Sequence, residues 1–206
     1  MDRAFRRQDE SPDSAFYQQP RFVTHIDDGA IAAVTQVYRE VLPAGGSVLD
    51  LMSSWVSHLP PEVAYSRVVG LGMNRAELAG NPRLASFVVH DLNRDPVLPF
   101  AAGEFDAATI CVSVDYLVAP EAVLRDAARV VRPGGPLVIT FSDRCFPTKA
   151  VRAWLEANDA GRKRLVQDWL AATGRWESIE VQDRGGRRPL GDPLYAIIAR
   201  SRGAVG

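Results

Sequence analysis

Residues able to do chemistry are concentrated in short stretches of this 206-residue sequence, each directly after an apolar run. Such a run, bounded by turn residues, reads as a buried strand. Carboxylate, hydroxyl and amide groups at strand ends are suited to hold a polar ligand. In an open α/β sheet, ligands bind beyond the carboxyl ends of the strands, near the point where the strand order reverses. The stretches that would line this site are 50–57, 72–74, 91–93, 113–116 and 142–145.

The elements that must position these residues alternate along the chain. Strands are predicted over residues 47–51, 67–71, 86–90, 105–113 and 137–141, and a last pair over 176–181 and 193–199. Helices are predicted after Asp27 or Asp28, after Asn74, and over 120–131, 147–158 and 160–173. This rhythm predicts a doubly wound, Rossmann-like α/β sheet that is mostly parallel and ends in a strand pair.

Composition sets limits on the class of protein. The 24 basic and 25 acidic residues give a formal charge of −1, which argues against a dedicated nucleic-acid-binding protein. No stretch has the length and apolarity of a signal peptide or a membrane span. Cys111 and Cys145 cannot form a disulfide framework, so we expect a cytoplasmic protein. One domain over 1–206 is expected, with a polar, loose arm before the α/β core at 28–206.

Several common sites are absent from the sequence. There is neither the G-x-G-x-x-G turn that a dinucleotide needs nor a G-x-x-x-x-G-K-[ST] phosphate loop. The histidines and cysteines have no metal-ligand spacing, so no metal site is predicted.

A series of motifs in the middle of the chain resembles a known family. Asp91 is followed by LPF at 98–100, EFD at 104–106, Tyr116-Leu117 and RVVRPGG at 129–135. In order and spacing this series is similar to the second half of the class I S-adenosylmethionine-dependent methyltransferases (methyltransferase type 11). The resemblance covers residues 47–142. It implies a terminal antiparallel strand pair, an N-terminal helical lid over residues 1–27, and S-adenosylmethionine bound across the first four strand ends.

The sequence departs from the family pattern at two cofactor positions. The family's loop after the first strand reads D-x-G-x-G-x-G, whereas residues 50–56 here read DLMSSWV and contain no glycine. The family also has a carboxylate at the end of the second strand, for the ribose hydroxyls, where this chain has Gly72. Glycines at such places allow the backbone to approach a ligand and to adopt unusual φ angles.

Other groups can replace the missing ones. We expect hydroxyls of the loop to hold the amino acid end of the cofactor and the amide of Asn74 to bind the ribose. By the family pattern, Asp91 faces the adenine amino group and the residue after it supplies a backbone N–H. The predicted cofactor-binding residues are Asp50, Met52, Ser53, Ser54, Gly72, Met73, Asn74, Asp91, Leu92 and Ser113.

The acceptor side is expected to come from the N-terminal segment and from loops after the fourth and fifth strands. His25 is the preferred general base because of the ordinary pKa of imidazole, with Asp115 and Tyr116 as alternatives. Tyr17, Trp55 and Arg144 are the predicted substrate contacts, although Trp55 is equally suited to anchor a helix after the first strand. Arg144 can hold an acidic substrate or lower the pKa of the neighbouring Cys145 thiol.

The sequence thus predicts a methyltransferase that acts on a small molecule, without a membrane partner. The alternative is a methyltransferase fold that has lost methyl transfer and binds another ligand or a protein partner. RNA methylation ranks last because of the charge balance. The sequence leaves the acceptor and the oligomeric state open.

Overall fold

The structure, a computed structural model, describes residues 3–185 and 191–203. Its α-helices are α1 (Asp13–Phe16), α2 (Asp28–Val41), α3 (Arg75–Gly80), α4 (Pro120–Val130), α5 (Arg152–Glu156) and α6 (Asp159–Thr173). Two short 3-10 helices are η1 (Arg3–Phe5) and η2 (Val114–Tyr116). The strands are β1 (Ser47–Leu51), β2 (Arg67–Gly72), β3 (Ser86–Val89), β4 (Ala107–Cys111), β5 (Pro136–Phe141), β6 (Trp176–Asp183) and β7 (Tyr195–Ser201). No helix in these described ranges has the length and apolarity needed to cross a membrane.

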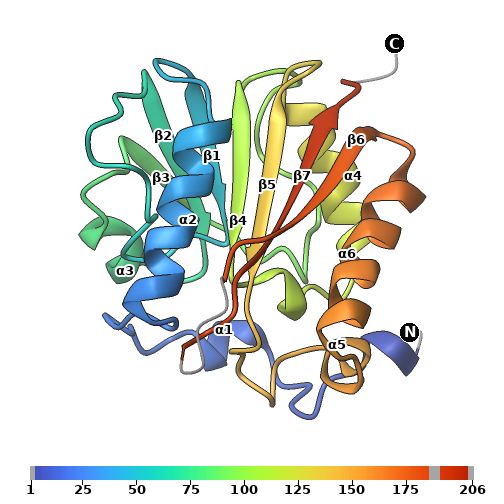
Figure 1. The fold of residues 1–206 in the computed structure, drawn as a ribbon. Helices are drawn as coiled ribbons and strands as arrows, with labels where there is room; N and C mark the ends of the chain where they lie inside the picture. Colours follow the sequence, from blue (N-terminus) through green and yellow to red (C-terminus); the bar gives the residue numbers. More distant parts are fainter. Residues whose placement is uncertain (1–2, 186–190, 204–206) are drawn as a thin grey trace.

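The strands form a seven-stranded sheet in the order β3-β2-β1-β4-β5-β7-β6 (Figure 1). Strands β1 to β5 pair in parallel, whereas β7 runs antiparallel to both β5 and β6. The strand order reverses between β1 and β4, so the switch point of the sheet lies beyond their carboxyl ends. The doubly wound, mostly parallel sheet and its terminal antiparallel pair are therefore confirmed.

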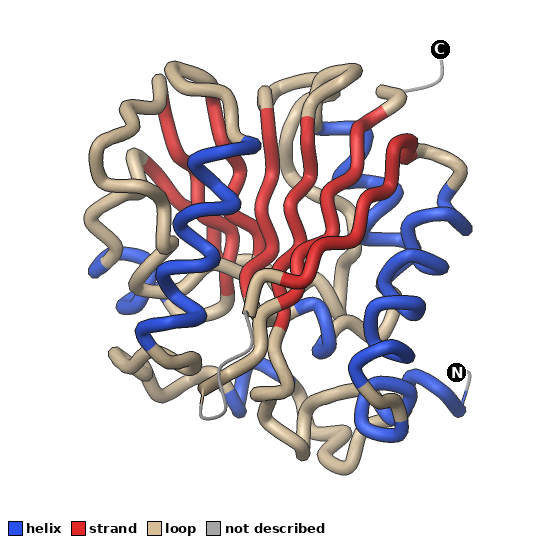
Figure 2. Tube along the Cα trace, in the orientation of Figure 1, coloured by secondary structure: helices blue, strands red, loops and turns tan. Residues whose placement is uncertain are grey.

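The two faces of the sheet are covered by different helices (Figure 2). On one face, Val34 and Val37 of α2 pack in a cluster with Val48 of β1 and equivalent residues of the neighbouring strands. Successive side chains of a strand point to opposite faces, so Leu49, the residue after Val48, lies on the other face. There it belongs to a cluster with residues of α4 and α6. All five residues of β1 are buried, which is the pattern expected for a strand covered on both faces. Asp27 caps α2, because its carboxylate accepts a hydrogen bond from the Ala30 amide at 2.8 Å.

The connection from β1 to β2 contains no helix over residues 52–66. Trp55 therefore does not anchor a helix after β1, which was one of its two predicted roles. The connection is held by scattered hydrogen bonds instead: the Thr35 hydroxyl of α2 donates to the His58 carbonyl, and Arg83 donates to the carbonyls of Pro60 and Val63. Two consecutive prolines at 60–61 explain this, since proline removes a helical donor and restricts the preceding residue.

The N-terminal segment is firmly docked, and its prediction as a loose arm is wrong. It runs beneath the carboxyl ends of the parallel strands, at the bottom of Figure 1. Asp13 is buried and forms a two-pronged contact with Arg7 at 2.8 and 2.9 Å. The fully buried ammonium of Lys149 lies 3.2 Å from Asp13 and 3.1 Å from Asp9. A buried ion-pair cluster thus holds the segment to the loop before α5.

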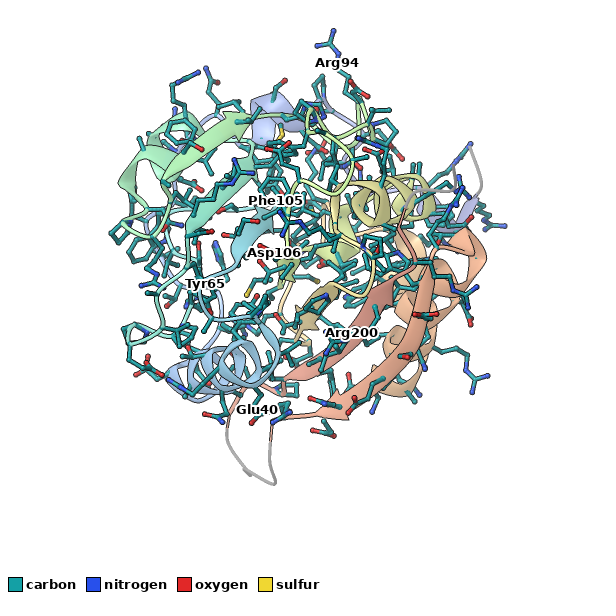
Figure 3. All side chains as sticks on the ribbon, turned by 90° about the horizontal axis from the view of Figure 1, so that it is seen from above. Glu40, Tyr65, Arg94, Phe105, Asp106 and Arg200 are labelled. Carbon is teal, nitrogen blue, oxygen red and sulfur yellow. The ribbon has the colours of Figure 1, made fainter. Side chains whose placement is uncertain are left out.

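The opposite edge of the sheet holds several of the residues that carry the family resemblance. Figure 3 looks onto this edge, with Phe105 and Asp106 near its centre. Asp106 accepts a hydrogen bond from the Ser47 amide at 2.8 Å and forms an ion pair with Arg132. The amides of Phe105 and Arg132 bond to the carbonyls of Val130 and Phe105. These residues secure the start of β1 and β4 and lie away from the predicted site.

Candidate functional site

A cavity of about 250 Å³ lies between the carboxyl edge of the parallel strands and the N-terminal segment. Its wall contains the residues that directly follow four strands: Met52 after β1, Met73 after β2, His90 after β3 and Val112 after β4. All the predicted cofactor residues line it except Asp50. The predicted catalytic and substrate residues line it except Trp55 and the alternative base Asp115. The topology therefore brings nearly the whole predicted set together at the switch point.

Asp50 lies beneath the cavity and organises the loop above it. Its carboxylate accepts hydrogen bonds from the hydroxyls of Ser53 at 2.6 Å, Ser57 at 2.7 Å and Thr109 at 2.9 Å. Burial raises the pKa of Asp50, and the three hydroxyl donors oppose that rise. Because Asn81 in turn donates to Ser57 at 2.8 Å, the loop is tied down by a connected polar network. Asp50 thus acts on the site through the loop.

The glycine-free loop follows a path that would suit glycine. Met52, at the first glycine position of the family pattern, has a φ of 56°. This left-handed conformation is strained for a side chain with a Cβ atom. The next residue, Ser53, donates its amide to the Leu71 carbonyl at 2.8 Å, so the loop packs directly against β2.

Asn74 is fully engaged within the protein. Its side-chain oxygen caps α3 by accepting from the amides of Ala76 and Glu77. Its amide group donates to the carbonyls of Tyr17 at 2.9 Å and Gln18 at 3.1 Å. Both amide hydrogens are used, so Asn74 holds the N-terminal segment and offers no free donor for a ribose.

Glu77 is a cavity residue that the sequence analysis did not select. It lies in the first turn of α3, is buried, and lines the cavity. One carboxylate oxygen accepts from the Arg21 backbone amide at 2.7 Å, and the other from the Ser54 hydroxyl at 2.7 Å. The only signal for it in the sequence was its spacing three residues after Asn74, which also fits a simple helix cap.

The far end of the cavity combines a carboxylate with an unpaired hydroxyl. One oxygen of Asp91 accepts from the amides of Asn93 at 3.0 Å and Arg94 at 3.3 Å, which fixes the turn after β3. Ser113 is buried, and its hydroxyl has no hydrogen-bond partner among residues 3–185 and 191–203. A buried hydroxyl without a partner is costly and is commonly satisfied by a ligand or water.

The candidate bases differ in their protonation. Burial lowers the pKa of His25, with a smaller opposing effect of Glu77, so the ring is neutral and able to accept a proton at pH 7. Burial raises the pKa of Tyr116 far above its ordinary value of 10, so its phenol keeps its proton. The Tyr116 oxygen accepts a hydrogen bond from the Phe146 amide at 2.8 Å. Tyr116 thus holds the loop after β5 and is unsuited to act as a base.

The loop after β5 supplies the open side of the cavity. Arg144 lines it with a 63% exposed side chain whose nearest acid, Asp192, is 3.9 Å away. Burial raises the pKa of the Cys145 thiol, and the opposing effect of Arg144 is the smallest of its causes. Arg144 thus lowers that pKa as the sequence suggested, but burial outweighs it and the net shift is upward.

Trp55 lies outside the cavity and joins the loop after β1 to the N-terminal segment. Its indole N–H donates to the Val23 carbonyl at 3.0 Å, and its ring is 6.3 Å from that of Phe22. Tyr17, by contrast, lines the cavity, and burial raises the pKa of its phenol.

Comparison with known proteins shows similarity to methyltransferases over part of the chain. Residues 54–139 match the family model described as a methyltransferase domain. Over 113 residues the chain is 39% identical to the demethylmenaquinone methyltransferase of Corynebacterium urealyticum. This match covers 52% of the chain and 46% of the relative. These matches support a class I S-adenosylmethionine-dependent methyltransferase, the family that the sequence motifs resemble. It spans less than half the length of the curated relatives that it matches.

Solved structures share the fold at low sequence identity. The [4+2]-cyclase SpnF has a TM-score of 0.64 and 15% identity, with 93% of this chain and 92% of that chain covered. Phosphoethanolamine N-methyltransferase 2 of Haemonchus contortus, solved with S-adenosyl-L-methionine, has a TM-score of 0.58 and 13% identity, with 83% and 52% covered. Because one of these folds is named as a cyclase, the fold alone does not fix the reaction.

The residues around the cavity fit the family cofactor, S-adenosylmethionine. The cavity crosses the ends of β1 to β4, which is where this family binds it. The unpaired Ser113 hydroxyl offers a hydrogen bond there, and Glu77 supplies a buried carboxylate near the end of β2, where the family's own acid is missing. The donor set suits a ligand with hydroxyl, amino and carboxylate groups.

Proposed function

We propose that the protein transfers a methyl group from S-adenosylmethionine to a small molecule. The observation that carries the proposal is the single cavity wall shared by two sets of residues. One set follows the ends of β1 to β4, and the other comes from the N-terminal segment and the loop after β5. Cofactor and acceptor sites that share one enclosed space are what a direct transfer requires.

On the cofactor side, five residues are proposed to make the contacts. Asp91 and the Leu92 amide hold the adenine, Glu77 takes the ribose hydroxyls, and Ser54 and Ser113 hold the amino acid end. The remaining members of the predicted set support these contacts: Asp50 fixes the loop through Ser53, and Asn74 fixes α3 and the N-terminal segment. When bound, the cofactor supplies a methyl group already activated on a positively charged sulfur.

On the acceptor side, the chain's own residues position the acceptor and manage a proton. His25 accepts the proton that the acceptor atom loses, since its lowered pKa keeps the ring neutral. Tyr116 keeps its proton and fixes Phe146, which forms part of the wall. The docked N-terminal segment covers the site and excludes water.

The size and cover of the cavity support a small acceptor. A volume of about 250 Å³ lies just below the usual range of small-molecule sites, about 300–1,000 Å³, and leaves no room for a macromolecular acceptor inside the cavity. The curated relatives are named demethylmenaquinone methyltransferases. The formal charge of −1 gives no general attraction for RNA.

Calorimetric titration with S-adenosylmethionine and S-adenosylhomocysteine tests the proposal. We expect dissociation constants in the micromolar range, about −8 kcal/mol. Asp91→Ala and Glu77→Gln should each weaken binding about tenfold or more, whereas Asp168→Ala on the exposed face of α6 should not. Absence of binding at millimolar ligand would contradict the proposal.

One observation favours a second candidate, a methyltransferase fold that binds a different ligand. The strained Met52 and the packing of the Ser53 loop against β2 change the loop in which the family pattern has glycines. If neither S-adenosyl compound binds the folded protein, this second candidate replaces the first.

A further inference from the structure

Arg21 is a cavity residue that lies in the N-terminal segment between α1 and α2. Its backbone amide donates to Glu77 at 2.7 Å, and its Nη2 atom donates to the Phe16 carbonyl at 2.9 Å. The side chain is therefore fixed at both ends, and its position does not depend on the loop after β5. A guanidinium held in this way is pre-organised for a ligand.

Aromatic rings surround the guanidinium of Arg21. Its central carbon lies 4.6 Å from the ring centre of Phe16, 5.4 Å from that of Phe146 and 5.8 Å from that of Tyr17. Such rings attract cations over their faces. Here the protein's own cation occupies that position, so the same rings are not free to receive a cationic acceptor.

One edge of the guanidinium is unused. The Nη1 atom of Arg21 is buried and has no hydrogen-bond partner among the residues that the structure describes. The hydrogen bonds of Glu77 come from the Arg21 backbone amide and the Ser54 hydroxyl. The acid Asp13 of the same wall is paired with Arg7 and Lys149. A planar guanidinium with a free edge matches a carboxylate or another anionic oxygen.

Two further groups on the wall suit an anionic, planar ligand. Arg144, on the loop after β5, adds a second positive charge to the cavity. The Phe146 ring contacts Arg21 at its face and stands 5.2 Å from the ring of His25, the proposed base. An acceptor beside the Phe146 ring would thus reach both the cation and the base.

We propose that the methyl acceptor is a planar small molecule with an anionic oxygen, a carboxylate or phenolate, that binds the Nη1 edge of Arg21. This inference rests on the proposed function, because it names the class of acceptor for the same cavity. Arg21 is its specificity-determining residue.

Ligand-observed fluorine NMR tests the inference with three probes of one shape and different charge. These are para-fluorobenzoate, para-fluorobenzyl alcohol and para-fluorobenzylammonium, each titrated into the full chain with saturating S-adenosylhomocysteine. We expect the benzoate to bind and the ammonium not to bind, with the alcohol weaker than the benzoate. Arg21→Gln should weaken benzoate binding about tenfold or more, Arg21→Lys should have a smaller effect, and Arg164→Gln on the exposed side of α6 should have none.

The outcomes separate this inference from the proposed function. Equal binding of the three probes, no binding of the benzoate, or benzoate binding unchanged in Arg21→Gln overturns the inference. If Arg21→Gln fails to fold, as judged by its melting temperature, the charge series on the wild type and Arg21→Lys still decides. Binding of S-adenosylhomocysteine is measured separately by calorimetry, so a failed benzoate titration with intact S-adenosylhomocysteine binding leaves the proposed function standing. Benzoate selectivity without S-adenosylhomocysteine binding would overturn the proposed function, and with it the assignment of the Arg21 ligand as a methyl acceptor.

Discussion

The carbonyl oxygen of Ser53 lies 2.2 Å from the point that a Cβ atom on Gly72 would occupy. The loop after β1 thus fills the space through which a side chain would leave the end of β2. The two departures from the family pattern, the glycine-free loop and the missing carboxylate, are therefore one structural change. With the loop on this path, position 72 cannot carry a carboxylate into the cavity. Glu77 on α3 supplies one instead.

Gly72→Ala should strongly destabilise the protein. The added Cβ meets backbone, which cannot move without breaking the Ser53–Leu71 hydrogen bond. We expect a loss of about 3 kcal/mol or more in the free energy of unfolding, measured with urea. Gly80→Ala is the matched control, because there the nearest atom belongs to the exposed ring of Phe22, which can move. A loss at Gly72 no larger than at Gly80 would show that the loop does not occupy this space.

At position 52 a glycine variant should be more stable than an alanine variant, which is the reverse of the usual order. Met52→Gly and Met52→Ala both remove the side chain, so they lose the same packing. Only glycine adopts the φ of 56° without strain. We expect Met52→Gly to be more stable than Met52→Ala by about 1 kcal/mol in urea unfolding, whereas ordinary positions favour alanine. Equal stabilities, or a more stable alanine variant, would mean that the left-handed conformation carries no strain.

Much of the fold was predictable because its signals are local. Buried runs such as 47–51 and 137–141 read as strands without knowledge of their partners, and β1 begins and ends where predicted. The motif residues around Asp106 and Arg132 were informative through the order and spacing of their motifs, although their contact at the amino edge of the sheet spans 26 positions. The docking of the N-terminal segment was missed because Asp13 meets Lys149, a partner 136 positions further along the chain.

The candidate site was predictable in place but not in detail. Topology alone puts residues after strand ends at one edge, which is why the predicted set surrounds one cavity. The partners of each side chain depend on tertiary contacts that no spacing reveals. Asn74 is occupied by the carbonyls of Tyr17 and Gln18, and Glu77 meets Arg21 and Ser54. The roles of Asn74 and Glu77 therefore needed the structure.

Asp115→Asn should stabilise the protein more at pH 8 than at pH 5. Asp115 is buried, one of its carboxylate oxygens has no partner among the described residues, and burial raises its pKa from 3.8 to about 8. A carboxyl group whose pKa is raised in the folded state favours folding below pH 4 and loses that contribution as the pH rises towards 8. Asparagine does not titrate.

The free-energy difference between Asp115→Asn and wild type should therefore grow in favour of the variant between pH 5 and pH 8. We expect a growth of at least about 1 kcal/mol, or roughly 2–4 °C in Tm. Melting curves across this range check it, with Asp168→Asn on α6 as the control that shows no such trend. A constant difference would mean that Asp115 is ionised throughout.

Lys149→Met should release the N-terminal segment from the core. The ammonium of Lys149 is fully buried between Asp9 and Asp13, so its removal leaves a buried carboxylate with one cation fewer. Breaking a buried pair in this way costs about 3–5 kcal/mol. Because the segment contributes Tyr17, Arg21 and His25 to the cavity wall, its release should also weaken ligand binding.

Lys163→Met, the same change at the other lysine of the chain, should cost less, since Lys163 is partly exposed on α6. Limited proteolysis should cut Lys149→Met between residues 3 and 25 faster than it cuts Lys163→Met. Equal cutting would show that other contacts, such as the Asp9–Thr148 hydrogen bond, are sufficient to hold the segment.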